Sequence, residues 1–111
     1  MQLSIVIPLY NEEESLPERH AWIRRIVEQE GYDYEILFID DGSRDNSWKV
    51  VQGLAQENPR VRAIQFQRNY GKSAALNEGF QASQGDVVIT MDADMQDSPD
   101  EIPELFSMIA S

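Results

Sequence analysis

The sequence alternates four times between a short apolar, β-branched run and a segment with helical periodicity. The apolar runs cover residues 3–9, 34–40, 61–66 and 86–91. They read as buried strands because they are short, nearly continuous in apolar character and bounded by polar clusters. Continuous apolar strands that alternate with helices predict a parallel sheet covered by helices on both faces, with right-handed crossovers. The fold class we expect is therefore α/β and Rossmann-like.

The segments between the apolar runs carry helix signals. In the first of them Leu16, His20, Ile23 and Val27 fall on one helical face, and Gly31 stands where a helix C-terminus is expected. Helices are also predicted over residues 47–58 and 73–83 and from about Pro99 onward, where proline suits a first helical turn. A glycine inside the third helix, at position 79, predicts close packing on the sheet.

Polar clusters follow all four predicted strands, at residues 10–14, 40–47, 67–73 and 92–97. The carboxyl ends of parallel strands meet at one edge of the sheet, and ligands bind there, where the strand order reverses. A strand order of 3-2-1-4 would bring the clusters after the first and fourth strands together. Tyr10, Asn11 and Glu12 would then lie beside the aspartates of the fourth cluster.

The fourth cluster, "DADMQD", is suited to a metal ion. In an extended segment Asp92, Asp94 and Gln96 share one face while Ala93 and Met95 take the other. Two carboxylates and an amide oxygen are ligands for a hard cation such as Mg²⁺ or Mn²⁺. The alternative, a solvated acidic turn that caps the next helix, fits the neighbouring side chains better; these are Asp97, Ser98, Asp100 and Glu101.

Two other ligand motifs fail on spacing. A calcium-binding EF-hand loop that starts at Asp92 would need glycine and glutamate where Asp97 and Pro103 stand. A phosphate-binding P-loop that includes Gly71 would need a second glycine where Phe66 stands. Nucleic acid is also an unsuitable partner, because 20 acidic against 9 basic residues give a net charge of -11.

The second cluster contains Asp40 and Asp41 at the tip of the second strand. An acidic residue there can accept hydrogen bonds from a nucleobase or a ribose. The structural alternative is that Asp40 ties down the turn while Asp45 or Asn46 caps the helix that follows. The shared edge with the metal candidates favours a ligand role for one of the two carboxylates.

Five segments, taken in order, resemble glycosyltransferase family 2 enzymes with a GT-A fold, and among these the dolichol- and undecaprenyl-phosphate sugar transferases. They are "SIVIPLYNEEESL", "DDGSRDNSW", "QRNYGKSAALNEGF", "GDVVITMDADMQD" and "PDEIPEL". The resemblance covers essentially all 111 residues. It implies the N-terminal, nucleotide-sugar-binding part of such a domain over residues 1–111, with the acceptor-binding half absent from this chain.

The resemblance also implies roles for individual residues. Asp92, Asp94 and Gln96 would hold a Mg²⁺ or Mn²⁺ ion on the diphosphate of the donor. The residues implied to bind the nucleotide sugar are Pro8, Tyr10, Glu12, Ile39, Asp41, Lys72, Asp92, Ala93 and Asp94. Arg68 resembles basic residues near the acceptor or diphosphate. No catalytic residue is assigned, and His20 reads as a packing or surface residue because it lies on the apolar stripe.

The implied reaction is an inverting transfer, of hexosyltransferase type, from a UDP- or GDP-sugar to an acceptor such as a polyprenyl phosphate. Two alternatives remain: a phosphate-accepting receiver domain, and a sugar-nucleotide-binding module without turnover. A receiver has its acidic pair after the first strand and a lysine after a fifth, whereas here the pair follows the second strand. Within a transferase, the isolated fragment is expected to be inactive.

The surroundings of the chain are predicted from composition. There is no cysteine, and the longest apolar run is shorter than a membrane span, which favours a cytoplasmic chain. Contact with a membrane is expected only through a region beyond Ser111. If the fourth strand is an exposed edge, it invites self-association through residues 86–91.

Overall fold

The computed structural model describes residues 1–94 and 98–110. Strands and helices alternate along the chain as the periodicity predicts, and each boundary lies within a few residues of the expected one. The ordered elements are β1 (Leu3–Leu9), α1 (Leu16–Gln29), β2 (Tyr34–Asp40), α2 (Ser47–Glu57), β3 (Val61–Gln65), α3 (Lys72–Ala82), β4 (Val87–Thr90), the 3-10 turn η1 (Pro99–Glu101) and α4 (Ile102–Ala110).

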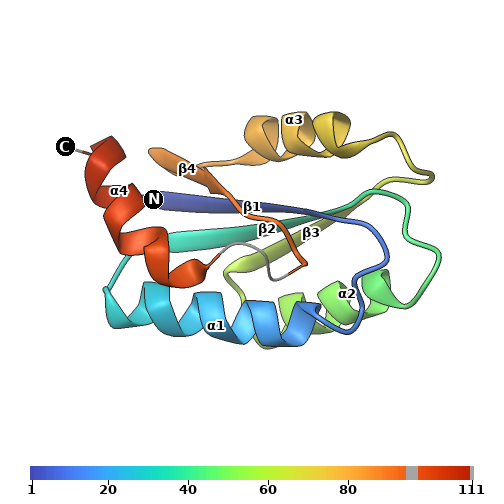
Figure 1. Cartoon of the computed structure of the whole chain (residues 1–111), viewed down its shortest axis with the longest axis horizontal. Helices are drawn as coiled ribbons and strands as arrows, with labels where there is room; N and C mark the ends of the chain where they lie inside the picture. Colours follow the sequence, from blue (N-terminus) through green and yellow to red (C-terminus); the bar gives the residue numbers. More distant parts are fainter. Residues whose placement is uncertain (95–97, 111) are drawn as a thin grey trace.

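The four strands form one parallel sheet in the order β3-β2-β1-β4, which confirms the predicted order. All seven residues of β1 are buried, since β2 and β4 pair with it on its two sides. The loops that follow β1, β2 and β3 turn at the same end of the sheet (Figure 1). The reversal of strand order therefore lies between β1 and β4, beside the acidic segment after β4.

Helices cover both faces of the sheet. In Figure 1, α1 and α2 run along one face, and α3 lies on the other. The larger apolar core joins Ile5 and Ile7 of β1 to α1, α2 and α4, whereas Val6 points to the α3 side with Leu37 and Ala75. This alternation follows from the two-residue period of a strand. It explains why β1 must be apolar at nearly every position.

Two glycines have the roles that the sequence predicts. A Cβ atom on Gly79 would lie 2.3 Å from Val6 Cγ1, so α3 approaches β1 closely at this point. Gly31 follows the end of α1 with a φ of 73°. Its N–H and that of Tyr32 donate to Glu28 O at 3.2 Å and Val27 O at 3.1 Å. This is the Schellman pattern of helix termination.

Within the described residues, no helix combines the length and the apolar character needed to cross a membrane. β4 stands at the edge of the sheet. Self-association through this edge stays a prediction.

Candidate functional site

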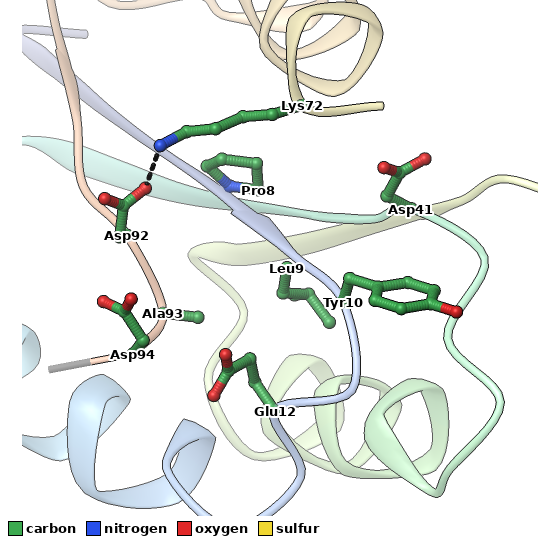
Figure 2. A pocket seen from close by; sticks show the side chains of 9 residues that line it. All are labelled: Pro8, Leu9, Tyr10, Glu12, Asp41, Lys72, Asp92, Ala93 and Asp94. Atoms are coloured by element: carbon green, nitrogen blue, oxygen red, sulfur yellow. Dashed lines mark ion pairs between the residues drawn. The ribbon is translucent and has the colours of Figure 1, made fainter. Parts of the chain in front are cut away.

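A cavity of about 340 Å³ lies at the carboxyl edge of the sheet. Its walls come from the ends of β1 and β2, the start of α3 and the segment after β4. The lining residues are Pro8, Leu9, Tyr10, Glu12, Asp41, Lys72, Asp92, Ala93 and Asp94. Figure 2 shows the acidic side chains of Asp92 and Asp94 at one end and the Tyr10 ring at the other. The structure thus brings together candidates that lie up to 86 positions apart in the sequence.

Two candidates from the sequence stand apart from this cavity, and the placement of a third is not described. Ile39 is fully buried in the apolar cluster under α3 and is not among the lining residues. The Arg68 guanidinium lies over the ring of Tyr70, with 4.7 Å between the guanidinium carbon and the ring centroid. Gln96, the third expected metal ligand, falls outside the described residues, as does Asp97.

The segment Asp92–Asp94 alternates between solvent and core. Ala93 is 3% exposed and belongs to the large apolar core, whereas Asp94 is exposed and Asp92 is half-buried. In Figure 2 the two carboxylates turn to the same side and the Ala93 methyl group points away from them. The carboxylates share a side as the sequence analysis expects, although residues 93–94 form a turn and not extended backbone. Asp92 and Asp94 line the cavity together with Ala93.

Lys72, the first residue of α3, reaches across the cavity to this segment. Its Nζ lies 2.6 Å from Asp92 Oδ1 (Figure 2). The two side chains are 61% and 33% exposed, so water screens the pair and its contribution to stability is small. The contact shows that the Asp92 carboxylate and the Lys72 ammonium group meet at the edge of the cavity.

Two residues that the sequence analysis missed hold the backbone of this acidic segment. Ser15 Oγ donates to Ala93 O at 2.8 Å, and Arg19 Nε donates to Asp92 O at 3.0 Å. Arg19 is fully buried. A signal was present, because Arg19 falls three positions after Leu16 and four before Ile23, inside the apolar stripe of α1. An arginine at such a position needs a specific partner.

The loops after β1 and β2 are tied to each other. Asn11 N and Glu12 N donate to Ser43 Oγ and Ser47 Oγ, each at 2.9 Å. Asn11 Oδ1 in turn accepts from Arg44 N at 2.8 Å, and Asn11 has a φ of 54°, a left-handed conformation that asparagine tolerates. These bonds fix the wall of the cavity formed by Tyr10 and Glu12.

The two aspartates after β2 have different roles. Asp40 is fully buried, and its Oδ1 accepts from Ser43 N at 2.9 Å, which is the turn-forming role weighed in the sequence analysis. Asp41 is 5% exposed, lines the cavity and accepts hydrogen bonds from the segment before α3. Asp41 is therefore the one of the two that reaches the candidate site.

The capping residues also match the structural alternative. Asp45 Oδ1 accepts from Ser47 N at 2.9 Å at the start of α2. Burial alone would raise the pKa of Asp45, but hydrogen bonds from Ser47 and Glu13 outweigh it and the net pKa is lowered. Ser98 Oγ accepts from Asp100 N at 3.3 Å, and Asp100 Oδ1 accepts from Trp22 Nε1 at 2.9 Å. Asp45 and Ser98 thus cap helix starts and Asp100 bonds to α1, whereas Asp92 and Asp94 line the cavity.

Solved structures share this fold. A mannosyltransferase from Pyrobaculum calidifontis, PcManGT, in complex with GDP-Man and Mn²⁺ superposes with a TM-score of 0.82 at 22% identity, over 99% of this chain and 32% of that one. S. aureus TarS 1–349 in complex with UDP gives a TM-score of 0.77 at 20% identity, with the same coverage. At these identities the likeness identifies the GT-A fold alone.

Two relatives at higher identity are proteins of Pseudomonas species. The protein of P. fluorescens (strain SBW25) is 50% identical over 109 residues, which are 97% of this chain and 32% of the relative. That of P. syringae pv. syringae (strain B728a) is 48% identical over 108 residues, or 96% and 32%. Both are named undecaprenyl-phosphate 4-deoxy-4-formamido-L-arabinose transferase. This chain thus spans about a third of their length.

A family model described as "Glycosyl transferase family 2" matches residues 4–111. Among the described residues, the match takes in β1 from its second residue, all the later strands and helices, and every residue that lines the cavity. This match excludes the alternative that the chain is a receiver domain. The chain belongs to glycosyl transferase family 2.

Proposed function

We propose that this chain forms the donor-binding part of a metal-dependent, inverting glycosyltransferase that takes its sugar from a nucleotide diphosphate. One observation carries the proposal. A single cavity gathers two carboxylates and an ammonium group at one end and an exposed aromatic ring at the other, as Figure 2 shows. A nucleotide diphosphate has the matching halves, a charged diphosphate and a flat base.

The metal end fits a hard divalent cation. Asp92 and Asp94 supply carboxylate oxygens on the same side of the chain. The positively charged Lys72 ammonium group already forms an ion pair with Asp92. Among residues 1–94 and 98–110, no group of three His, Cys, Asp or Glu side chains is placed to hold a metal. Two protein ligands suit Mg²⁺ or Mn²⁺, which also take oxygens from substrate phosphates. Such an ion would neutralise charge on the leaving diphosphate.

The other lining residues have roles in the same proposal. Lys72 would bind a phosphate oxygen of the donor, because its ammonium group is already at the diphosphate end. Tyr10, which is 40% exposed, offers an aromatic face to the base, and Pro8 and Glu12 line the base and ribose pocket beside it. Asp41 closes this wall, where the resemblance implies a contact to the base edge to which Ile39 would contribute backbone.

The sugar and the acceptor follow from the relatives, as proposals. Their names favour a pentose derivative, 4-deoxy-4-formamido-L-arabinose, over the hexose expected from the resemblance, and undecaprenyl phosphate as the acceptor. Such an acceptor is itself an anion, so it needs little help from a general base. Transfer to a lipid carrier would bring the whole protein to the cytoplasmic face of a membrane.

A thermal-shift panel tests the donor site. Mn²⁺ with UDP or GDP is expected to raise the Tm, by ~10 °C when the ligand is present at about 100 times its Kd, because the ligand binds only the folded chain. Nucleotide without metal is expected to change the Tm little.

The variant Asp94→Ala is expected to abolish the shift with Mn²⁺ and nucleotide. Asp86→Ala is the matched control, since Asp86 is an exposed aspartate just before β4, at the opposite end of that strand. A shift that survives in Asp94→Ala, or one that disappears in Asp86→Ala, would argue against the assigned site.

A further inference from the structure

The carboxylate of Asp41 is engaged by the segment that leads into α3. Its Oδ1 accepts from Tyr70 N at 2.7 Å, and its Oδ2 accepts from Gly71 N at 3.0 Å and from Asn69 Nδ2 at 3.1 Å. The side chain is only 5% exposed, so these are well-shielded, charge-assisted hydrogen bonds. Both oxygens of Asp41 therefore hold the backbone that immediately precedes Lys72.

A second contact fixes the same two segments against each other. Gly42 has a φ of 75°, and a Cβ atom at this position would lie 2.3 Å from Arg68 C and 2.6 Å from Asn69 N. Such an approach is open only to glycine. The turn after β2 and the segment 68–71 are thus packed backbone to backbone, with the Asp41 carboxylate as the bridge between them.

Lys72 depends on this arrangement for its place. Its side chain is 61% exposed, so packing around the side chain contributes little to its orientation. Gly71, with a φ of 103° and a ψ of 159°, sets the start of α3, and its N–H is one of those that Asp41 holds. The backbone of residues 70–71 consequently sets the point from which the Lys72 side chain extends toward Asp92.

We propose that Asp41 is a positioning residue that acts on the donor diphosphate through the backbone of Tyr70 and Gly71 and the side chain of Lys72. This inference rests on the proposed function of the cavity as a nucleotide-sugar site. It is distinct from a direct contact between Asp41 and the base, because the Asp41 oxygens already accept three hydrogen bonds from residues 69–71.

Inorganic pyrophosphate with Mn²⁺ separates the two roles, since this ligand has no base and no sugar. Calorimetric titration would compare the unmodified chain with Asp41→Asn, Lys72→Ala and the double variant. Asp41→Asn is expected to weaken Mn²⁺–pyrophosphate binding about fivefold. The substitution removes the negative charge and one of the two acceptor oxygens, which loosens the backbone of residues 70–71. In the double variant the loss is expected to equal that of Lys72→Ala alone, because Asp41 acts through Lys72.

The same titration with Mn²⁺ and UDP or GDP identifies the alternative. If Asp41→Asn weakens nucleotide binding and leaves pyrophosphate binding unchanged, Asp41 contacts the base and the positioning role is overturned. Additive losses in the double variant also overturn it. If the unmodified chain binds neither ligand, the proposed function itself fails, which is a distinct outcome.

A second variant keeps the test decisive if Asp41→Asn does not fold. Gly42→Ala leaves the Asp41 carboxylate intact but forces the backbone of Arg68 and Asn69 to move. It is expected to weaken Mn²⁺–pyrophosphate binding in the unmodified background and to have no further effect once Lys72 is alanine. Unchanged pyrophosphate binding in folded Gly42→Ala contradicts the inference.

Discussion

Lys72 Nζ lies 2.6 Å from Asp92 Oδ1, so the first residue of α3 is joined to the acidic segment after β4 across the mouth of the cavity. A metal ion bound by Asp92, as proposed, would compete with the Lys72 ammonium group for this carboxylate when no nucleotide is present. With a diphosphate present, both can be satisfied, because phosphate oxygens supply further acceptors.

Removing this ammonium group is expected to strengthen the binding of Mn²⁺ alone. A half-exposed ion pair contributes about 0–1 kcal/mol, so Lys72→Ala should tighten Mn²⁺ binding by up to about fivefold in calorimetry without nucleotide. Lys49→Ala removes the same charge from an exposed position on α2 and serves as the control. Binding of Mn²⁺ that is weaker in Lys72→Ala than in the control would show that the two cations do not compete.

The contact between α3 and β1 predicts opposite effects for two glycine substitutions. Gly79→Ala places a methyl group against Val6 and is expected to lower the free energy of unfolding by about 1–3 kcal/mol. Gly53→Ala, inside α2 with nothing within 4 Å of the added atom, is expected to raise it by about 0.5–1 kcal/mol. Urea unfolding followed by circular dichroism measures both. Equal effects would contradict the close approach at Gly79.

Much of the architecture was predictable because it depends on local periodicity. The apolar runs and their spacing predicted the strands, and the rule that ligands bind where strand order reverses brought Asp92 and Asp94 beside the end of β1. The close packing at Gly79 was also foreseen, since an interior glycine weakens a helix and needs a reason.

The contacts that orient the site were not predictable in the same way. Arg19 falls inside the apolar stripe of α1, but periodicity does not show which group this buried charge bonds to, which is the Asp92 carbonyl 73 positions away. The bonds of Asp41 join residues 28 to 30 positions apart and depend on how two loops approach each other. Nothing in the local sequence at Asp41 separates a base contact from a backbone contact.

The hydroxyl group of Ser15 is expected to affect the site through the Ala93 carbonyl that accepts from it. Ser15→Ala should lower the free energy of unfolding by about 0.5–1.5 kcal/mol and also weaken the binding of Mn²⁺ with nucleotide. Ser83→Ala is the control, because Ser83 Oγ donates to Phe80 O at 2.7 Å at the far end of α3. Nucleotide titrations that give the same Kd for both variants would exclude a role of Ser15 in holding the acidic segment.

His20 is expected to make stability depend on pH through the core, away from the cavity. Its side chain is 4% exposed, and Asn58 Nδ2 lies 3.2 Å from its Nε2. The Asn58 amide is oriented by Arg60 N, which donates to Asn58 Oδ1 at 3.1 Å, so Nε2 acts as the acceptor and the ring is neutral. Burial, and then the charge of Arg24, lower the pKa of His20, and Glu57 and Glu28 only partly oppose this.

A lowered histidine pKa means that the unfolded chain binds a proton more readily than the folded chain. The free energy of unfolding is therefore expected to fall as the pH drops from about 7.5 to about 5.5, above the range in which the carboxylates titrate. The variant His20→Gln keeps a polar side chain without a titrating ring, so its stability should change less over this interval. Urea titrations at the two pH values measure the difference, and equal slopes in both proteins would mean that His20 is not buried in its neutral form.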